Sequence, residues 1–194
     1  SNFVKLLLDN DIPNASELYK EIRKDYPIFL TRDINTAKAW IKTKVKGSER
    51  YGMIASSGAK RLRKYGIWIQ NKVEAEKWFL NPKNDIRSSY FLEETATEFD
   101  IQGLELDWTI VCWDANLRYN QNFEYYNFTG DSWKNINKEE IRVYLKNTYR
   151  VLLTRARQGF IIFVPQGDSE DETMQTKFYD GVYDYLKNIG IEEI

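Results

Sequence analysis

Two short segments of this chain carry the residues best suited to chemistry on a phosphate. Residues 97–107 read Thr-Glu-Phe-Asp-Ile-Gln-Gly-Leu-Glu-Leu-Asp, and residues 149–157 read Tyr-Arg-Val-Leu-Leu-Thr-Arg-Ala-Arg. The glycine of the first segment, Gly103, lets the backbone approach a ligand that a side chain would keep away. An arginine such as Arg155 in the second is always charged and presents a planar fork of donors. No Gly-x-x-x-x-Gly-Lys-Ser/Thr loop occurs in the chain, so a triphosphate would need a cradle on another domain.

The composition excludes several other kinds of site. The chain has no histidine, which removes histidine-based catalytic triads and histidine metal ligands, and its one cysteine, Cys112, cannot form a zinc cluster or an internal disulfide. We therefore expect no metal site formed by this chain. No apolar run is long enough to cross a bilayer, and the chain starts Ser-Asn. We expect one cytoplasmic domain spanning residues 1–194, excised from a larger protein and without a membrane partner.

Charge is unevenly distributed although the net charge is only −1. Residues 38–72 contain ten Lys or Arg and one acid, whereas residues 168–194 contain eight acids and two lysines. A solvated face is the simplest explanation of either run. The basic segment is also where a groove that follows phosphates could lie. Aromatic residues, at 15%, would suit base stacking, although a tightly packed core explains them as well.

Short apolar runs alternate with amphipathic stretches, a pattern typical of βαβ units. We predict an α/β fold in which helices cover both faces of a mainly parallel sheet. The expected helices span residues 14–24, 36–45, 59–65, 73–80, 138–158 and 172–188. The expected strands span residues 27–31, 51–55, 90–97, 108–113 and 160–164, with residues 118–133 forming a hairpin or long loop.

The first chemical segment resembles motif V of superfamily 1 helicases, which runs from a strand through a tight turn into a short helix. The resemblance implies that Gln102, Gly103 and Glu105 face ATP, with Glu105 accepting a hydrogen bond from the ribose. It also implies that Thr97 contacts a nucleic-acid phosphate. Many relatives have histidine where this chain has Phe99, which weakens the expected strand contact, although a phenyl ring could stack on a base. Taken alone, residues 102–105 would be read as a surface turn.

The second segment resembles motif VI, because a long helix carrying Leu-Thr-Arg-Ala-Arg precedes a glycine and an apolar strand. The resemblance implies that Arg155 is the arginine finger, which stabilises charge on the γ-phosphate oxygens. It also implies that Thr154 orients the turn, and that Arg150 and Arg157 are auxiliary phosphate ligands. The alternative for these last two is that they are solvent-facing charges on a helix.

Nearly the whole chain is also similar to the C-terminal half of the bacterial DUF2075 proteins, which are Schlafen group 3-like DNA/RNA helicases. Residues 51–63, 78–82, 87–90, 95–113 and 147–165 carry this similarity. In these proteins a phosphate-loop domain precedes this one. We therefore expect Ser56, Ser57, Lys60 and Arg61 near either phosphate or strand. Arg87, which comes before the motif V strand, is a second candidate for the ATP side.

These resemblances imply a RecA-like three-layer αβα sandwich, the fold of phosphate-loop NTPases without the loop itself. The expected function is that of the second RecA-like domain of an ATP-dependent helicase or translocase. Its expected partners are the N-terminal RecA-like domain of the same protein and single-stranded DNA or RNA. ATP and Mg²⁺ would be bound mainly by that other domain, so the isolated chain should be inactive. The alternative is a non-catalytic nucleic-acid or protein interaction domain; an independent hydrolase would lack a histidine-based site.

Overall fold

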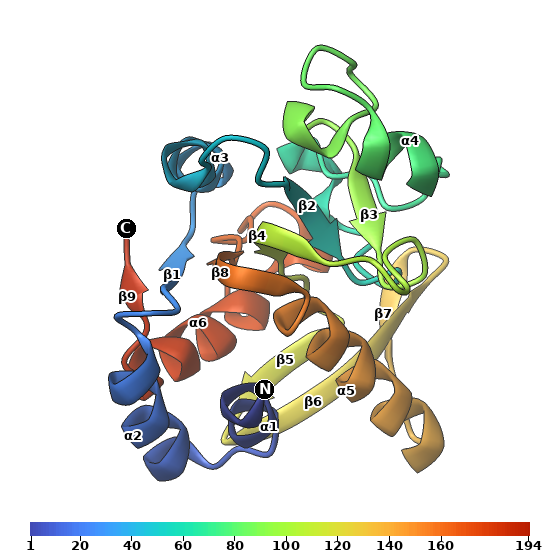
Figure 1. The fold of residues 1–194 in the computed structure, drawn as a ribbon. Coiled ribbons are helices and arrows are strands. Elements are labelled where there is room, and N and C mark those ends of the chain that lie inside the picture. Colours follow the sequence, from blue (N-terminus) through green and yellow to red (C-terminus); the bar gives the residue numbers. More distant parts are fainter.

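A six-stranded parallel sheet forms the centre of the computed structural model, which describes all 194 residues (Figure 1). The strand order is β3-β2-β4-β8-β1-β9, and every neighbouring pair is parallel. The strands are β1 (Ile28–Thr31), β2 (Tyr51–Ala55), β3 (Thr95–Thr97), β4 (Leu106–Cys112), β8 (Ala156–Phe163) and β9 (Glu192–Glu193). All strands point the same way, so the sheet has one amino edge and one carboxyl edge.

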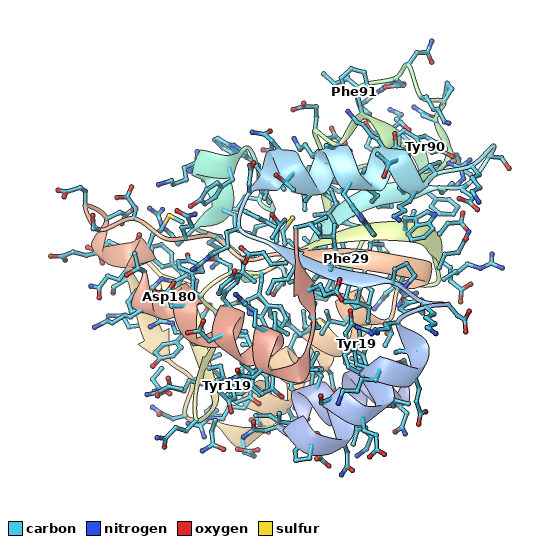
Figure 2. The ribbon with its side chains drawn as sticks, turned by 90° about the vertical axis from the view of Figure 1, so that its left-hand side faces the viewer. Tyr19, Phe29, Tyr90, Phe91, Tyr119 and Asp180 are labelled. Atoms are coloured by element: carbon cyan, nitrogen blue, oxygen red, sulfur yellow. The ribbon has the colours of Figure 1, made fainter.

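Helices cover both faces of this sheet, and the expected three-layer αβα sandwich is confirmed. On one face lie α1 (Asn2–Leu8), α2 (Ile12–Ile22), α5 (Glu139–Leu153) and α6 (Lys177–Ile189), whereas α3 (Ile34–Lys44) and the 3₁₀ turn Leu62–Tyr65 lie on the other. The short helix α4 (Ala75–Leu80) lies beside β2, where Trp78 packs on Gly52. Figure 2 shows Tyr19 and Tyr119 on the α2 and α6 side of the sheet, with Tyr90 and Phe91 on the other side.

The side chains of β4 alternate between the two faces of the sheet, so this strand contributes to an apolar cluster on each face. Ile110 and Cys112 belong to the apolar cluster under α3, whereas Val111 and Trp113 belong to the larger cluster under α5 and α6. Successive side chains of a strand point to opposite faces, so a strand buried on both sides reads as an unbroken apolar run. The strand predicted at residues 108–113 is confirmed and begins two residues earlier, at Leu106.

The hairpin that was one of the two alternatives at residues 118–133 is confirmed, and a third strand extends it to a separate antiparallel sheet. It contains β5 (Leu117–Asn120), β6 (Asn122–Thr129) and β7 (Ser132–Asn135), with β6 in the middle. Residues with positive φ, Gln121 and Gly130, form the two tight connections. This small sheet packs against α6.

The long helix predicted at residues 138–158 is wrong at its end. Helix α5 ends at Leu153, and Gly159 lies inside β8 rather than terminating the helix. Arg157 therefore lies on a strand, so the alternative in which Arg150 and Arg157 are both charges on one helix is wrong for Arg157. The hydroxyl of Thr154 donates to the Arg150 carbonyl at 2.7 Å, which closes the last turn and lets the chain turn into β8.

Smaller differences concern the ends of other elements. The helix predicted at residues 59–65 is only the 3₁₀ turn Leu62–Tyr65, and the strand predicted at 90–97 is shortened to β3. Helix α2 begins at Ile12, two residues before the predicted start, with Asp11 as its N-cap, because the Asp11 carboxylate accepts from the Asn14 backbone N–H. None of the helices combines the length and apolar character that a membrane span requires.

Candidate functional site

The turn at residues 102–105, hereafter the glycine turn, lies at the amino edge beside Arg155. The glycine turn precedes β4 and Arg155 precedes β8, and these two strands are paired, with Leu106 opposite Ala156. Loops that precede neighbouring parallel strands meet at the same edge of the sheet. The backbone N–H of Leu106 donates to the Arg155 carbonyl at 3.4 Å, and the Arg155 guanidinium donates to the Leu104 carbonyl at 2.6 Å. The structure thus joins the two chemical segments.

The glycine turn itself is open to solvent. Gly103 has φ +74°, a left-handed conformation that a side chain disfavours, and a Cβ added there would meet no atom within 4 Å. Gln102 and Glu105 are exposed on either side of it. Glu105 lies 3.8 Å from Arg157, and both of these side chains are exposed. The glycine is therefore required by the backbone conformation, and the space above the turn is free for a ligand.

Arg155 is half-buried and carries its charge without an acidic partner. Its Nε is buried with no hydrogen-bond partner, and no carboxylate lies within ion-pair distance of its guanidinium. A charged donor without a partner is costly in a finished structure, so such a group is a candidate for contact with an anion or another domain. Thr154 positions it by closing α5. Arg150, one turn earlier, donates to Asn147 at 2.5 Å and remains on the helix.

Arg87 is not brought into this group. It lies in the segment between α4 and β3, where its guanidinium donates to both oxygens of Asp85 at 3.1 and 2.9 Å. This arginine holds the pKa of the Asp85 carboxyl well below its usual range. No hydrogen bond or ion pair joins Arg87 to the glycine turn or to Arg155.

At the opposite, carboxyl edge, residues 56–58, hereafter the serine turn, adjoin the end of β3. Strands β2 and β3 are paired, with Ala55 opposite Thr97, so the residues that follow them are neighbours. The backbone N–H and the hydroxyl of Ser57 donate to the two oxygens of Glu98 at 2.7 and 2.6 Å. Ser56 is buried, and its hydroxyl accepts from Asn116 at 3.0 Å.

Thr97 and Phe99, both predicted to contact nucleic acid, lie at this edge with different exposure. The hydroxyl and backbone N–H of Thr97 donate to Asp100 at 3.0 and 2.8 Å, so the threonine is tied into its own turn. The ring of Phe99 is 55% exposed. An exposed ring next to a polar edge is free to stack on a base.

Lys60 and Arg61 are also near this edge, but their charged groups are held by the protein. The Lys60 ammonium donates to the Phe128 carbonyl at 3.0 Å. The Arg61 guanidinium donates to Thr173 at 2.8 Å and forms an ion pair with Asp171 at 3.2 Å. Both side chains therefore join the serine-turn region to β6 and the C-terminal segment, and a phosphate would have to compete with these contacts.

A groove of about 540 Å³ opens at the carboxyl edge, and the serine turn forms one of its walls. Glu98 and Asn116 extend that wall, and the opposite wall comes from β6, β7 and the first half of α5. The residues of this opposite wall are Tyr126, Asn127, Lys134, Asn135, Ile136, Asn137, Lys138, Ile141, Tyr144, Leu145 and Thr148. Pockets of this size commonly hold small ligands or single chemical groups of larger ones.

A buried polar network around Asp114 supports the wall that contains Asn116. Asp114 is fully buried and accepts from the Tyr179 hydroxyl at 2.8 Å and from the backbone N–H groups of Ala115 and Arg61 at 2.8 and 2.9 Å. Burial raises the pKa of the Asp114 carboxyl above its ordinary value. The Tyr149 hydroxyl donates to Asn116 at 2.6 Å, so helices α5 and α6 both fix this wall.

With the two edges described, the chain can be compared with known proteins. The family model of the Schlafen group 3, DNA/RNA helicase domain matches residues 1–166. The chain belongs to this family. Neither a curated protein nor a solved structure matches it. The matched region contains the glycine turn, the serine turn and Arg155, and it ends before α6, so a helicase-like function is assigned to the part of the chain that forms both edges.

Sequence reasoning missed most of the groove in this Schlafen group 3 domain. Its β6 and β7 wall lies in a region expected to be a hairpin or loop, and no motif marked Lys134, Lys138 or Tyr144. The one available signal was the mixture of aromatic residues and asparagines at residues 118–137, which is typical of neither a core strand nor a plain linker. No group of three or more His, Cys, Asp or Glu side chains is arranged to hold a metal ion.

Proposed function

We propose that this chain acts as the second RecA-like domain of an ATP-dependent superfamily 1 DNA/RNA helicase or translocase. The observation that carries the proposal is the contact between Arg155 and the glycine turn. Two segments about fifty residues apart, each resembling a nucleotide-facing helicase motif, lie side by side at one edge of the sheet, joined by a 2.6 Å hydrogen bond. The match to the helicase domain family supports the same assignment.

In this proposal the amino edge contributes half of an ATP site. The residues present fit that part: an open glycine turn, the exposed Glu105 and an arginine whose Nε has no partner. The chain lacks a phosphate loop, so the triphosphate and Mg²⁺ would be held by the N-terminal RecA-like domain of the same protein. ATP supplies the free energy of γ-phosphate hydrolysis. Arg155 would place a permanent positive charge beside the γ-phosphate, and Glu105 would accept a hydrogen bond from the ribose.

The carboxyl edge would contact the nucleic-acid strand in the same proposal. Thr97, Phe99 and the serine turn gather there, on the opposite edge from Arg155. The two ligands therefore need not compete for space. A non-catalytic interaction domain of the same fold would keep the carboxyl edge but would not need Arg155.

The deciding experiment is the ATPase rate of the full-length protein, with and without single-stranded DNA or RNA. Arg155→Ala should lower kcat by roughly 10³-fold or more while changing the KM for ATP much less, because the arginine acts mainly on the transition state. Arg155→Lys tests whether charge alone suffices. Arg23→Ala is the matched control, since its exposed charge pairs with Glu192 and contacts neither the glycine turn nor Arg155.

Two results would contradict the proposal. A near-normal kcat in Arg155→Ala would make the arginine a structural clamp on the Leu104 carbonyl. Absence of ATP turnover in the unaltered full-length protein would favour the non-catalytic alternative. The 194-residue chain alone should neither hydrolyse ATP nor bind it tightly, which calorimetry can check.

A further inference from the structure

The groove wall opposite the serine turn, hereafter the outer wall, comes from elements outside the helicase-like motifs. Strands β6 and β7 and the first half of α5 face the serine turn across the groove. We propose that this outer wall binds a single-stranded nucleic acid, with Lys134 and Lys138 contacting phosphates and Tyr144 stacking on a base. The proposal rests on the proposed function and names residues for strand binding that the motifs do not include.

Charge is the first argument for this occupant. Lys134 and Lys138 are exposed, and neither forms an ion pair or a side-chain hydrogen bond within the chain. The one acid among the lining residues is Glu98, whose two oxygens are both occupied by Ser57. Glu139, next to Lys138, faces Arg142 at 4.0 Å. The two lysines outnumber the one carboxylate, so the groove lining carries a net positive charge, which complements a phosphate backbone.

The aromatic residues of the wall are the second argument. Tyr144 is 52% exposed on α5 and shows a free face to the groove region. Tyr126 is different, because the Arg118 guanidinium lies over its ring at 3.8 Å. Stacking on a free aromatic face is how single-strand binding proteins hold bases without sequence preference. Tyr144 is therefore the stacking residue of this wall, and Tyr126 supports it.

The asparagine side chains of the outer wall and the volume of the groove are the third argument for this occupant. Asn135 and Asn137 have exposed side chains with no hydrogen bond in the chain, and Asn127 bonds only to Thr129. These groups can donate to and accept from the edges of an unpaired base. The groove volume of about 540 Å³ suits one or two nucleotides. A duplex uses its Watson–Crick edges in pairing and hides its base faces in the stack, which would leave the exposed Tyr144 ring without a base to stack on, so a single strand fits better.

The test is fluorescence anisotropy of labelled oligothymidylate and oligouridylate with the 194-residue protein, titrated at several salt concentrations. Replacing both lysines (Lys134→Ala with Lys138→Ala) should flatten the dependence of log K on log[salt] by about 0.7 for each lost phosphate contact. The matched control replaces Lys20 in α2 and Lys24 in the turn after it, which are exposed and unpaired and contribute nothing to the groove. That control should leave the slope nearly unchanged.

A second pair of variants tests stacking separately. Tyr144→Ala should weaken binding by roughly 5- to 150-fold, the range for loss of one stacked base, whereas Tyr144→Phe should bind almost normally. These exposed positions should not affect folding, which circular dichroism can verify. Three results overturn the proposal: no binding of either oligonucleotide at low salt, affinities unchanged in the groove variants, or equal competition by duplex. Each is distinguishable from failure of the ATPase proposal, which concerns Arg155 at the opposite edge.

Discussion

The link between Glu98 and Ser57 allows a quantitative test of how the carboxyl edge is held together. Glu98 is only 7% exposed and accepts two hydrogen bonds from Ser57 at 2.7 and 2.6 Å. A hydrogen bond to a charged group contributes about 1.5–3 kcal/mol, and a buried donor left without a partner costs about 1–3 kcal/mol. Water in the adjacent groove can replace part of this loss. We expect Glu98→Ala to lower the free energy of unfolding by about 2–4 kcal/mol.

The contact between Glu98 and Ser57 also predicts how the effects of Glu98→Ala and Ser57→Ala combine in a double variant. Ser57→Ala removes the hydroxyl donor but keeps the backbone N–H, so we expect a loss of about 1–2 kcal/mol. Either single change already breaks the hydrogen bond between the two side chains, so the double variant should lose less stability than the sum of the single variants. The difference, the coupling free energy, should be about 1–2 kcal/mol. Glu98→Gln keeps one carbonyl acceptor and should lie between the unaltered protein and Glu98→Ala.

Urea denaturation of the four proteins of this cycle, followed by far-ultraviolet circular dichroism, provides the measurement. The midpoint should move while the slope stays constant, since the folded surface does not change. Additive losses, with a coupling below roughly 0.5 kcal/mol, would refute the reasoning, because they would mean that the two residues do not interact in solution. Glu98 would then be held by another group, and the serine turn would be free of the segment after β3.

Three further predictions concern residues away from the groove. Burial raises the pKa of Cys112 to about 12, so iodoacetamide at about pH 8 should modify it only after urea unfolds the chain. Gly181→Ala should cost about 3 kcal/mol in urea titrations, because a Cβ on α6 would collide with the Tyr119 carbonyl. A hydrogen bond from Lys146 lowers the pKa of Asp9 to about 2. This contact therefore stabilises the folded protein fully when the pH is above the pKa that Asp9 has in the unfolded chain, and the stabilisation is lost as the pH falls towards 2. Asp9→Asn should therefore cost about 1 kcal/mol at neutral pH, after allowance for solvent screening, and almost nothing near pH 2.

The parallel sheet could be predicted because its strands carry a strong local signal. Residues 108–113 and 160–164 are nearly unbroken apolar runs, which is what burial on both faces requires. The end of α5 could not be predicted in the same way. Leu152 and Ala156 are four residues apart, so the helical pattern seemed to continue, yet Ala156 is buried as the first residue of β8. Ala156 fits both the helical and the strand periodicity, and only its pairing with Leu106 of β4 decides between them.

The order of strands in the sheet explains which parts of the site could be predicted from the sequence and which could not. The resemblance of the two segments to helicase motifs implied phosphate chemistry for the glycine turn and Arg155. Their contact depends on β4 and β8 being neighbours, which is a long-range property. The sequence placed Arg87 near the same ligand, whereas the structure ties it to Asp85. The groove was missed because its outer wall combines β6, β7 and α5, elements that are distant in sequence from the serine turn.

The segment from Thr97 to Glu105 connects the two proposed ligand edges directly. It leaves the carboxyl end of β3, crosses the sheet face that carries α5 and reaches the amino end of β4. Its backbone folds into two consecutive tight turns, with Ile101 N–H bonded to the Thr97 carbonyl at 3.2 Å and Leu104 N–H bonded to the Ile101 carbonyl at 3.1 Å. Ile101 is completely buried, and Arg155 holds the Leu104 carbonyl. The segment between the two proposed ligand edges is therefore fixed by a buried side chain and by hydrogen bonds, and it is not a loose loop.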